Sequence, residues 1–190
     1  RIEIVPLCES LVGLMEPLAR RKDIRLILDV PKTLPAVETD PKTLQQILFN
    51  LLSNAVKFTA AAPGVGSPVV TLRVESLRPG PGEAVERTRL CVIDTGPGID
   101  PSDQARIFEK FQQADAGIAR GHEGTGLGLA ISKELATLIQ GEIHLVSDVG
   151  RGAMFSLVIP NEMDREGLEE LAARRGLRFI DEGEAEPQTS

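Results

Sequence analysis

Hydrophobic residues near the start of the chain recur every three or four positions, which predicts an amphipathic helix over residues 6–21. The stripe consists of Leu7, Leu11, Leu14 and Leu18. A second helix is predicted to begin at Asp40-Pro41, because aspartate is a favourable N-cap and proline is tolerated at the first helical position. It ends before Pro63-Gly64. A third helix is predicted over about 126–139, and a short one over 102–108.

Between these helices, runs rich in Val, Ile and Leu predict five strands. They cover residues 24–30, 69–75, 88–93, 141–147 and 153–159. The order helix-strand-helix-strand-strand-helix-strand-strand predicts an α/β fold, a two-layer sandwich with about three helices on one face of a mixed β-sheet. We expect residues 1–160 to form one domain. Residues 161–190 are expected to form a charged helix and a disordered tail or linker.

Composition narrows the classes of partner. The 190 residues are 42% hydrophobic, with six Phe and no Trp or Tyr, so the core is expected to be aliphatic. A formal charge of -7 argues against nucleic acid or an anionic membrane as the main partner. Cys8 and Cys91 are expected to be buried and reduced, as in a cytoplasmic protein. No apolar run approaches the roughly 20 residues that span a bilayer.

The second helix carries a stripe of polar side chains. Asn50, Asn54 and Lys57 lie on the same side of the helix, because they stand four and three residues apart. The adjacent stripe, expected to face the core, consists of Leu44, Ile47, Leu51, Ala55 and Phe58. Amide oxygens can bind a hard cation, and an ammonium can meet phosphate oxygens. A solvated helix face is the alternative interpretation.

Asp94 opens the sequence Asp-Thr-Gly-Pro-Gly-Ile, which directly follows a predicted strand. A carboxylate at a strand end, next to Gly96 and Gly98, can face a flat ligand that the backbone approaches closely. The carboxylate would accept a hydrogen bond from an amine such as adenine N6 and would repel the carbonyl oxygen of guanine. The alternative is an ordinary tight turn.

A second glycine-rich segment, Gly124-Thr-Gly-Leu-Gly-Leu129, opens the third helix. The free N–H groups and the positive dipole at a helix N-terminus favour phosphate. Close helix packing with a hinge is the alternative. Between the two glycine segments, Phe108 and Phe111 are expected to pin a loop that covers the ligand, with Lys110 and Arg120 as phosphate-side cations. The alternative for this loop is a poorly ordered surface segment.

Together the segments resemble the catalytic ATP-binding domain of sensor histidine kinases, in the family that also contains gyrase, Hsp90 and MutL. The family's N, G1, F and G2 boxes are similar, in that order, to "NLLSNAVKFT", "DTGPGI", "IFEKF" and "GTGLGLAIS". The likeness covers roughly residues 1–160. It implies the ATP-binding fold of that family, with ATP and Mg²⁺ as cofactors.

The resemblance also implies roles for single residues. Asn54 would hold Mg²⁺, with Asn50 in support, and Lys57 would contact phosphate; Asn50 and Lys57 would be the catalytic pair. Phe58 would stack near the adenine and Asp94 would bind its N6. The complete implied ATP-binding set is Asn50, Asn54, Lys57, Phe58, Asp94, Gly96, Gly98, Ile99, Phe111, Arg120, Gly124, Thr125, Gly126, Leu127, Gly128 and Leu129.

In the ATPase branch of the family a glutamate that activates water stands where Asn50 stands here. An amide cannot accept that proton, so phosphoryl transfer to a histidine is expected rather than hydrolysis. His122 and His144 lack the setting of an acceptor, so the acceptor is expected on separate dimerisation helices of the same parent protein, with a response-regulator receiver domain downstream. The alternatives are a regulatory ATP-binding module without kinase activity and a serine kinase of the anti-sigma-factor type.

Overall fold

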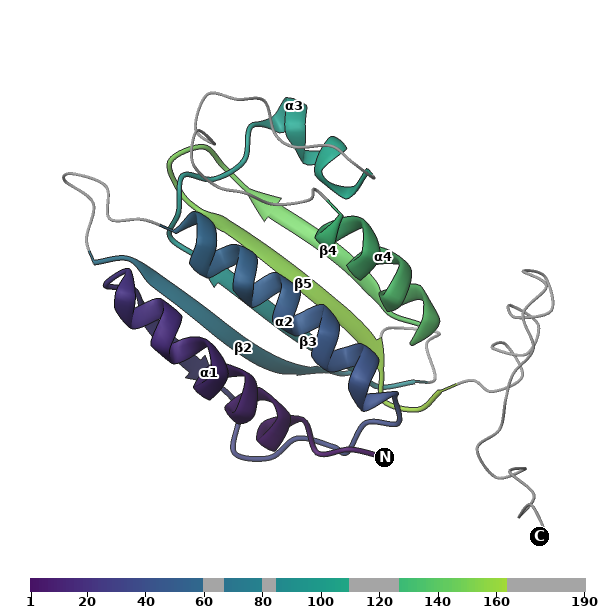
Figure 1. The fold of residues 1–190 in the computed structure, drawn as a ribbon. Helices are drawn as coiled ribbons and strands as arrows, with labels where there is room; N and C mark the ends of the chain where they lie inside the picture. The colour runs from purple at the N-terminus through teal and green to yellow at the C-terminus, as the bar shows by residue number, and fades with distance from the viewer. Residues whose placement is uncertain (60–66, 80–84, 110–126, 164–190) are drawn as a thin grey trace, which may run out of the picture.

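The computed structural model describes residues 1–59, 67–79, 85–109 and 127–163 (Figure 1). The helices are α1 (Ile4–Arg21), α2 (Pro41–Phe58), α3 (Pro101–Gln104), the 3₁₀ helix η1 (Arg106–Phe108) and α4 (Gly128–Leu138). The strands are β1 (Arg25–Asp29), β2 (Val69–Leu77), β3 (Arg87–Asp94), β4 (Glu142–Ser147) and β5 (Ala153–Pro160). Each helix and strand predicted between residues 6 and 159 is present, and the short helix predicted over 102–108 is divided into α3 and η1. The charged helix predicted after residue 160 lies outside the described residues.

The five strands form one sheet in the order β1-β2-β3-β5-β4. β1 and β2 are parallel, and the other neighbouring pairs are antiparallel. Helices α1, α2 and α4 lie across one face of this sheet (Figure 1). The predicted two-layer sandwich with a mixed sheet is therefore confirmed.

Helix α2 begins where the sequence predicts. The Asp40 side chain accepts a hydrogen bond from the backbone N–H of Thr43 at 2.7 Å, and Pro41 is the first helical residue. This bond satisfies one of the N–H groups that have no partner inside a helix. The helix then crosses the middle of the sheet, so its C-terminal end lies near the end of β3.

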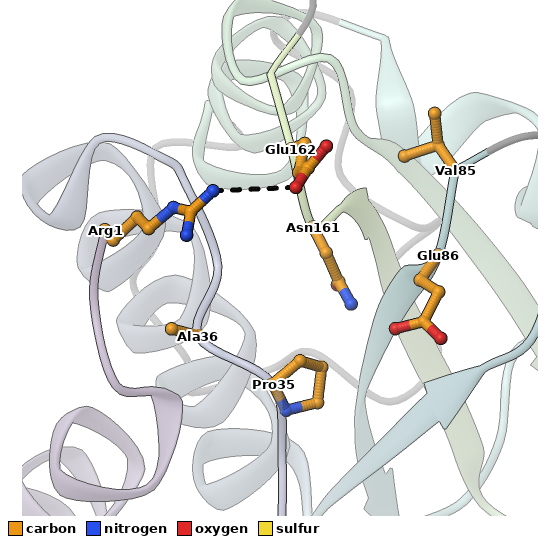
Figure 2. A pocket seen from close by; sticks show the side chains of 7 residues that line it. All are labelled: Arg1, Pro35, Ala36, Val85, Glu86, Asn161 and Glu162. Carbon is orange, nitrogen blue, oxygen red and sulfur yellow. Dashed lines mark ion pairs between the residues drawn. The ribbon is translucent and has the colours of Figure 1, made fainter.

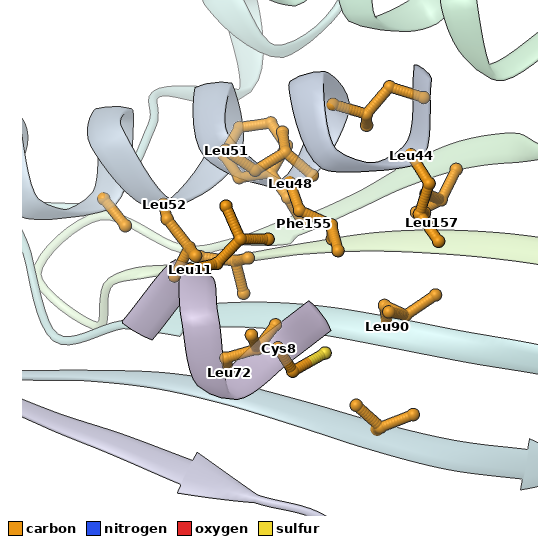
Figure 3. Close-up of a cluster of buried hydrophobic side chains, with 14 of the residues drawn as sticks. Cys8, Leu11, Leu44, Leu48, Leu51, Leu52, Leu72, Leu90, Phe155 and Leu157 are labelled. Atoms are coloured by element: carbon orange, nitrogen blue, oxygen red, sulfur yellow. The ribbon is translucent and has the colours of Figure 1, made fainter. Parts of the chain in front are cut away.

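The core lies between the helices and the sheet and is largely aliphatic (Figure 3). It contains Leu44, Leu48, Leu51 and Leu52 of α2, Cys8 and Leu11 of α1, and Leu72, Leu90, Phe155 and Leu157 of the strands. Cys8 is a free thiol whose pKa is raised to about 12 by burial and by the charge of Glu9. Cys91 is also free and buried, so both predictions for the cysteines are confirmed.

The prediction that Phe58 faces the core is wrong, because its side chain is 48% exposed. The buried residues Leu48, Leu52 and Val56 follow each other at intervals of four. Since a helix turns every 3.6 residues, each such step moves the buried face about 40° around α2. By the last turn the core contacts fall on Val56 and Thr59, and Phe58 is left on the solvent side.

The predicted leucine stripe of α1 is only partly correct. Leu11 is buried, but Leu14 is 58% exposed and Leu18 is 38% exposed. The residues that face the sheet beside Leu11 are Ile4, Cys8, Met15 and Ala19. The buried face of α1 is therefore built mostly from residues other than leucine, and a count of leucines does not reveal it.

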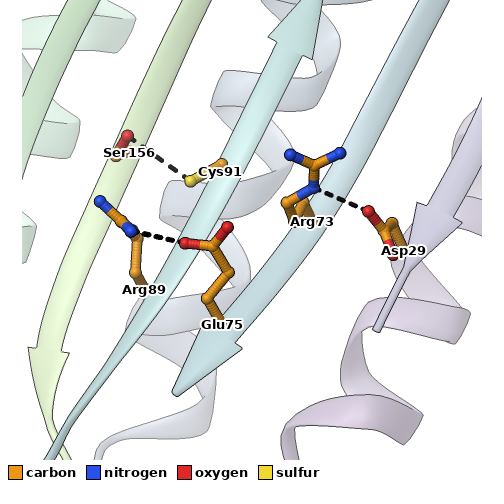
Figure 4. A network of polar contacts seen from close by, with 6 residues as sticks. All are labelled: Asp29, Arg73, Glu75, Arg89, Cys91 and Ser156. Atoms are coloured by element: carbon orange, nitrogen blue, oxygen red, sulfur yellow. Dashed lines mark hydrogen bonds and ion pairs between the residues drawn. The ribbon is translucent and has the colours of Figure 1, made fainter. Parts of the chain in front are cut away.

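The other face of the sheet carries polar pairs (Figure 4). Arg73 pairs with Asp29 at 2.7 Å, and Arg89 pairs with Glu75 at 2.6 Å. Such half-exposed pairs each stabilise a fold by about 0–1 kcal/mol, so they keep this face polar rather than hold the sheet together. No helix within the described ranges is long and apolar enough to cross a membrane.

Candidate functional site

Asp94 lies at the end of β3, beside the first residue of β5. Its Oδ1 accepts a hydrogen bond from the backbone N–H of Gly96 at 2.8 Å. Burial raises the pKa of the Asp94 carboxyl above its ordinary value of 3.8, while hydrogen bonds from the amides of Gly96 and Ala153 act in the opposite direction. The residue is therefore a partly desolvated acceptor that two backbone amides hold in place.

Gly96 brings the turn after Asp94 against the end of α2. A Cβ at this position would lie 2.8 Å from Asp94 Oδ1, 3.4 Å from the carbonyl oxygen of Phe58 and 3.6 Å from Thr59 Cα. A side chain here would therefore displace either the carboxylate or the helix end. The atoms nearest to Gly96 thus belong to the protein itself, and the close approach of a ligand stays a prediction.

Thr59, the C-cap residue of α2, adds a polar group that sequence reasoning did not single out. Its side chain is 1% exposed, and Oγ1 has no hydrogen-bond partner among the described residues. A buried hydroxyl without a partner is rare in native proteins unless a ligand or an ordered water completes it. Together with the carboxyl of Asp94, it fits a site that receives a polar ligand.

Gly98 serves the turn itself. Its φ is +73°, and a Cβ would overlap the carbonyl oxygen of Asp148 in the turn between β4 and β5. The N–H of Gly150 donates to the carbonyl of Pro97 at 2.7 Å, and the N–H of Ile99 donates to Ser147 Oγ at 2.9 Å. The β4–β5 turn thus braces the segment that follows Asp94, which supports the tight-turn interpretation for Gly98.

Asn50 connects α2 to the start of α4. Its Nδ2 donates to Ser132 Oγ at 2.8 Å, and Ser132 is 1% exposed. A Cβ on Gly128 would overlap Asn50 Oδ1 and lie 3.1 Å from Asn50 Cγ. The structure therefore brings the asparagine segment and the second glycine segment together, with Asn50 Oδ1 at the first turn of α4. Close helix packing at Gly128, the alternative named for that segment, is present.

Ser132 was missed by sequence reasoning, and its contact gives a test. We expect Ser132→Ala to lower the free energy of unfolding by about 1 kcal/mol, because Asn50 Nδ2 loses its acceptor at a partly buried contact. Thr137→Ala is the matched control, since Thr137 Oγ1 donates to the carbonyl of Lys133 at an exposed position of the same helix. Urea denaturation of Ser132→Ala, Asn50→Ala and the double variant should show coupling of about 1 kcal/mol. Additive effects would contradict the contact.

The remaining predicted residues on α2 lie near this site. Asn54 is partly buried and stands one turn after Asn50. Lys57 Nζ lies 5.0 Å from the ring centroid of the exposed Phe58.

Leu127 is the N-cap residue of α4 and Leu129 packs against the core. Phe111, Arg120, Gly124, Thr125 and Gly126 lie outside the described residues, as do Lys110 and His122.

Phe108 contacts the core from η1. Its ring centroid lies 6.2 Å from that of Phe155 with the planes at 72°, an edge-to-face arrangement, and Lys133 Nζ lies 5.5 Å from its centroid. The segment that precedes the predicted covering loop is therefore attached to both β5 and α4.

No group of three or more His, Cys, Asp or Glu side chains that could hold a metal occurs in the described part of the chain. Amide oxygens are acceptable ligands for Mg²⁺ but bring no charge.

A cavity of about 370 Å³ lies at the opposite end of the sheet (Figure 2). Its lining includes Arg1, Glu86, Asn161 and Glu162. The register of β3 and β5 places Asp94 at one end and this region at the other. The cavity contains none of the predicted site residues, so it is separate from the candidate site.

Comparison with known proteins identifies the family of the chain. Residues 39–163 match the family described as histidine kinase-, DNA gyrase B-, and HSP90-like ATPase. The circadian input-output histidine kinase CikA of Synechococcus elongatus is 41% identical over 82% of this chain and 19% of its own length. The sensor histidine kinase AruS of Pseudomonas aeruginosa is 43% identical over 78% of this chain and 14% of its own length. The chain therefore spans less than a fifth of these relatives.

Solved structures show the same fold. The crystal structure of full-length ShkA in complex with AMPPNP is 36% identical, with a TM-score of 0.70 over 84% of this chain and 30% of that one. The mycobacterial sensor histidine kinase MprB is 27% identical, with a TM-score of 0.66 over 85% of this chain and 97% of that one. By the family match, the relatives and the fold, the chain belongs to the histidine kinase-, DNA gyrase B-, and HSP90-like ATPase family, as a catalytic domain of the sensor histidine kinase type.

Proposed function

We propose that this domain binds ATP with Mg²⁺ between the end of α2 and the start of α4, and donates the γ-phosphoryl group to a histidine on separate dimerisation helices of its parent protein. The observation that carries the proposal is the desolvated carboxyl of Asp94, held by the N–H of Gly96 against the end of α2. The AMPPNP complex of the relative ShkA supports a nucleotide as the ligand.

The adenine end of the site would use Asp94 and Thr59. A carboxylate that accepts only hydrogen bonds suits the N6 amine of adenine and repels the O6 of guanine. The buried Thr59 hydroxyl, which has no partner among the described residues, could complete the polar contacts of the base directly or through one water. Asp94 would therefore determine which base is bound.

The phosphate end would use the polar stripe of α2 and the N-terminus of α4. Asn54 and Asn50 would offer amide oxygens to Mg²⁺. Lys57 and the backbone amides of Leu127 and Gly128 would face the phosphates. When bound, Mg²⁺ would neutralise charge on the phosphate oxygens. The fit is chemically consistent, because Asn50 Nδ2 is already engaged by Ser132 and its Oδ1 lies at the first turn of α4.

Asn50 also bears on the type of reaction. An amide side chain cannot take a proton from water, so this position provides no general base for hydrolysis. Catalysis would rest on positioning and electrostatic stabilisation of the transferred group. We place the reaction in the cytoplasm, with a response-regulator receiver domain as the next acceptor.

The chain alone, given Mg²⁺ and radiolabelled ATP, is expected to bind nucleotide and to acquire no stable label. Adding the dimerisation helices of the parent protein in trans should then produce acid-labile phosphohistidine on those helices. Label attached to the chain alone would contradict the division between the two domains. Acid-stable phosphate on the partner would indicate a serine kinase, and binding without any transfer would indicate a regulatory module.

A further inference from the structure

The C-terminal end of α2 receives a lysine from the end of α1. Lys22 Nζ donates to the backbone carbonyl of Val56 at 3.1 Å and to that of Lys57 at 2.8 Å. Carbonyl groups in the last turn of a helix have no partner within the helix, and they form the negative end of its dipole. The partly buried ammonium of Lys22 donates to two of these carbonyls, so it caps the end of α2 by both charge and hydrogen bonding.

The backbone at the end of α1 fixes the place of Lys22. The N–H of Asp23 donates to the carbonyl of Arg20 at 3.1 Å, and the N–H of Ile24 donates to that of Ala19 at 3.0 Å. These two bonds define a Schellman motif, with Lys22 as C-cap residue. Asp23 has a φ of +56°, which aspartate tolerates better than most residues, and the side chain of Ile24 is buried. The Schellman motif therefore fixes the backbone position from which the Lys22 side chain reaches α2.

The turn of α2 that Lys22 caps borders the candidate site. Lys57 belongs to it, and the carbonyl of Phe58 and the Cα of Thr59 are the backbone atoms nearest to a Cβ built on Gly96. The last helical turn of α2 therefore supports the loop at Gly96 that follows Asp94. If the last turn of α2 frayed, Lys57 and the backbone beside Gly96 would move together.

We infer that Lys22 is a positioning residue for the nucleotide site: it holds the last turn of α2 in the place that the ligand needs, without touching the ligand. The inference rests on the proposed function. It adds a residue outside the four motifs, from a different helix, to the set that determines nucleotide affinity.

Three variants test the inference. Lys22→Met keeps the length of the apolar stem and removes the ammonium, and Lys22→Arg restores a cation that can donate to carbonyls. Arg20→Met is the matched control, because Arg20 also lies at the end of α1 but pairs with the exposed Glu16 at 2.7 Å. Each protein is titrated with AMPPNP and Mg²⁺ by calorimetry, at a temperature where circular dichroism shows it fully folded.

Lys22→Met is expected to weaken AMPPNP binding about fivefold to tenfold, as loss of a partly buried helix-end charge would. Lys22→Arg should recover most of the affinity, and Arg20→Met should bind as the wild type does. Hydrogen exchange adds a readout that needs no ligand: the amide of Thr59, which donates to the carbonyl of Ala55 at 2.9 Å, should exchange faster in Lys22→Met alone.

The outcomes separate this inference from the proposed function. A wild-type chain that does not bind AMPPNP would overturn both. A wild-type chain that binds, with Lys22→Met binding equally well, would overturn the role of Lys22 alone, as would an equal loss in Arg20→Met. Should Lys22→Met fail to fold, Lys22→Gln takes its place with the same expected order of affinities.

Discussion

Replacing Asp94 by Asn is expected to weaken binding of AMPPNP by at least tenfold, about 1.4 kcal/mol or more, without lowering the stability of the domain. The amide can present its NH₂ group towards the N6 amine of adenine, so an acceptor becomes a poor or repulsive neighbour. The fold should tolerate the change, because the new side chain would keep one oxygen to accept from the backbone N–H groups of Gly96 and Ala153, and would remove a partly desolvated charge. Calorimetry gives the affinity and thermal unfolding gives the stability.

The pH dependence of Asp94→Asn follows from the direction of the pKa shift. Because the pKa of Asp94 in the folded state is raised above 3.8, the folded state binds more protons than the unfolded state in the interval just above that value. The wild type therefore loses stability relative to the variant as the pH rises from 3.8 through the raised pKa, and below 3.8 the difference in stability no longer changes with pH. Urea denaturation of both proteins across this pH interval measures the difference in their free energies of unfolding. A variant less stable than the wild type at neutral pH would contradict the account.

Replacing Gly152 by Ala is expected to lower the free energy of unfolding by about 3 kcal/mol or more. Its φ is +82°, and a Cβ would overlap the carbonyl oxygen of Asp94 and lie 2.8 Å from the carbonyl carbon. The clash is with backbone, so no side chain can move away to relieve it. Since the displaced group is that of Asp94, the folded fraction of the variant should also bind AMPPNP more weakly.

Gly150→Ala is the matched control in the same turn. Gly150 has a φ of +77°, and a Cβ there would meet nothing within 4 Å. Its replacement should therefore lower the free energy of unfolding only by the backbone strain, about 1 kcal/mol. Urea denaturation measures both variants. Equal losses in the two would show that contact with Asp94 adds nothing to the cost at Gly152.

The fold could be predicted because its signals are local. The N-cap at Asp40 and the strand runs each depend on a few neighbouring residues, and the structure confirms them. The faces of the helices were predicted less well. The exposure of Leu14 and Phe58 depends on how closely each helix packs and on how the buried stripe turns around it, and a leucine pattern contains neither.

The residues assigned to the site stay a prediction, and the contacts among them could not be predicted from the sequence. Asn50 and Ser132 are 82 positions apart, so their hydrogen bond depends on the fold rather than on spacing. Lys22 was missed because its acceptors are backbone carbonyls, which leave no mark in the sequence. Gly98 was attributed to the ligand, whereas its nearest neighbour is the backbone of Asp148. The roles assigned to residues 110–126 stay predictions.

The most direct test of the account compares two bases in two proteins. The affinities of the wild type and of Asp94→Asn are measured by calorimetry for ATP and for inosine triphosphate, which carries a carbonyl oxygen in place of the N6 amine. The account predicts that the wild type prefers ATP by at least about tenfold, and that the variant loses or reverses this preference, because its amide can donate to the carbonyl. The same preference in both proteins would show that Asp94 does not bind the base.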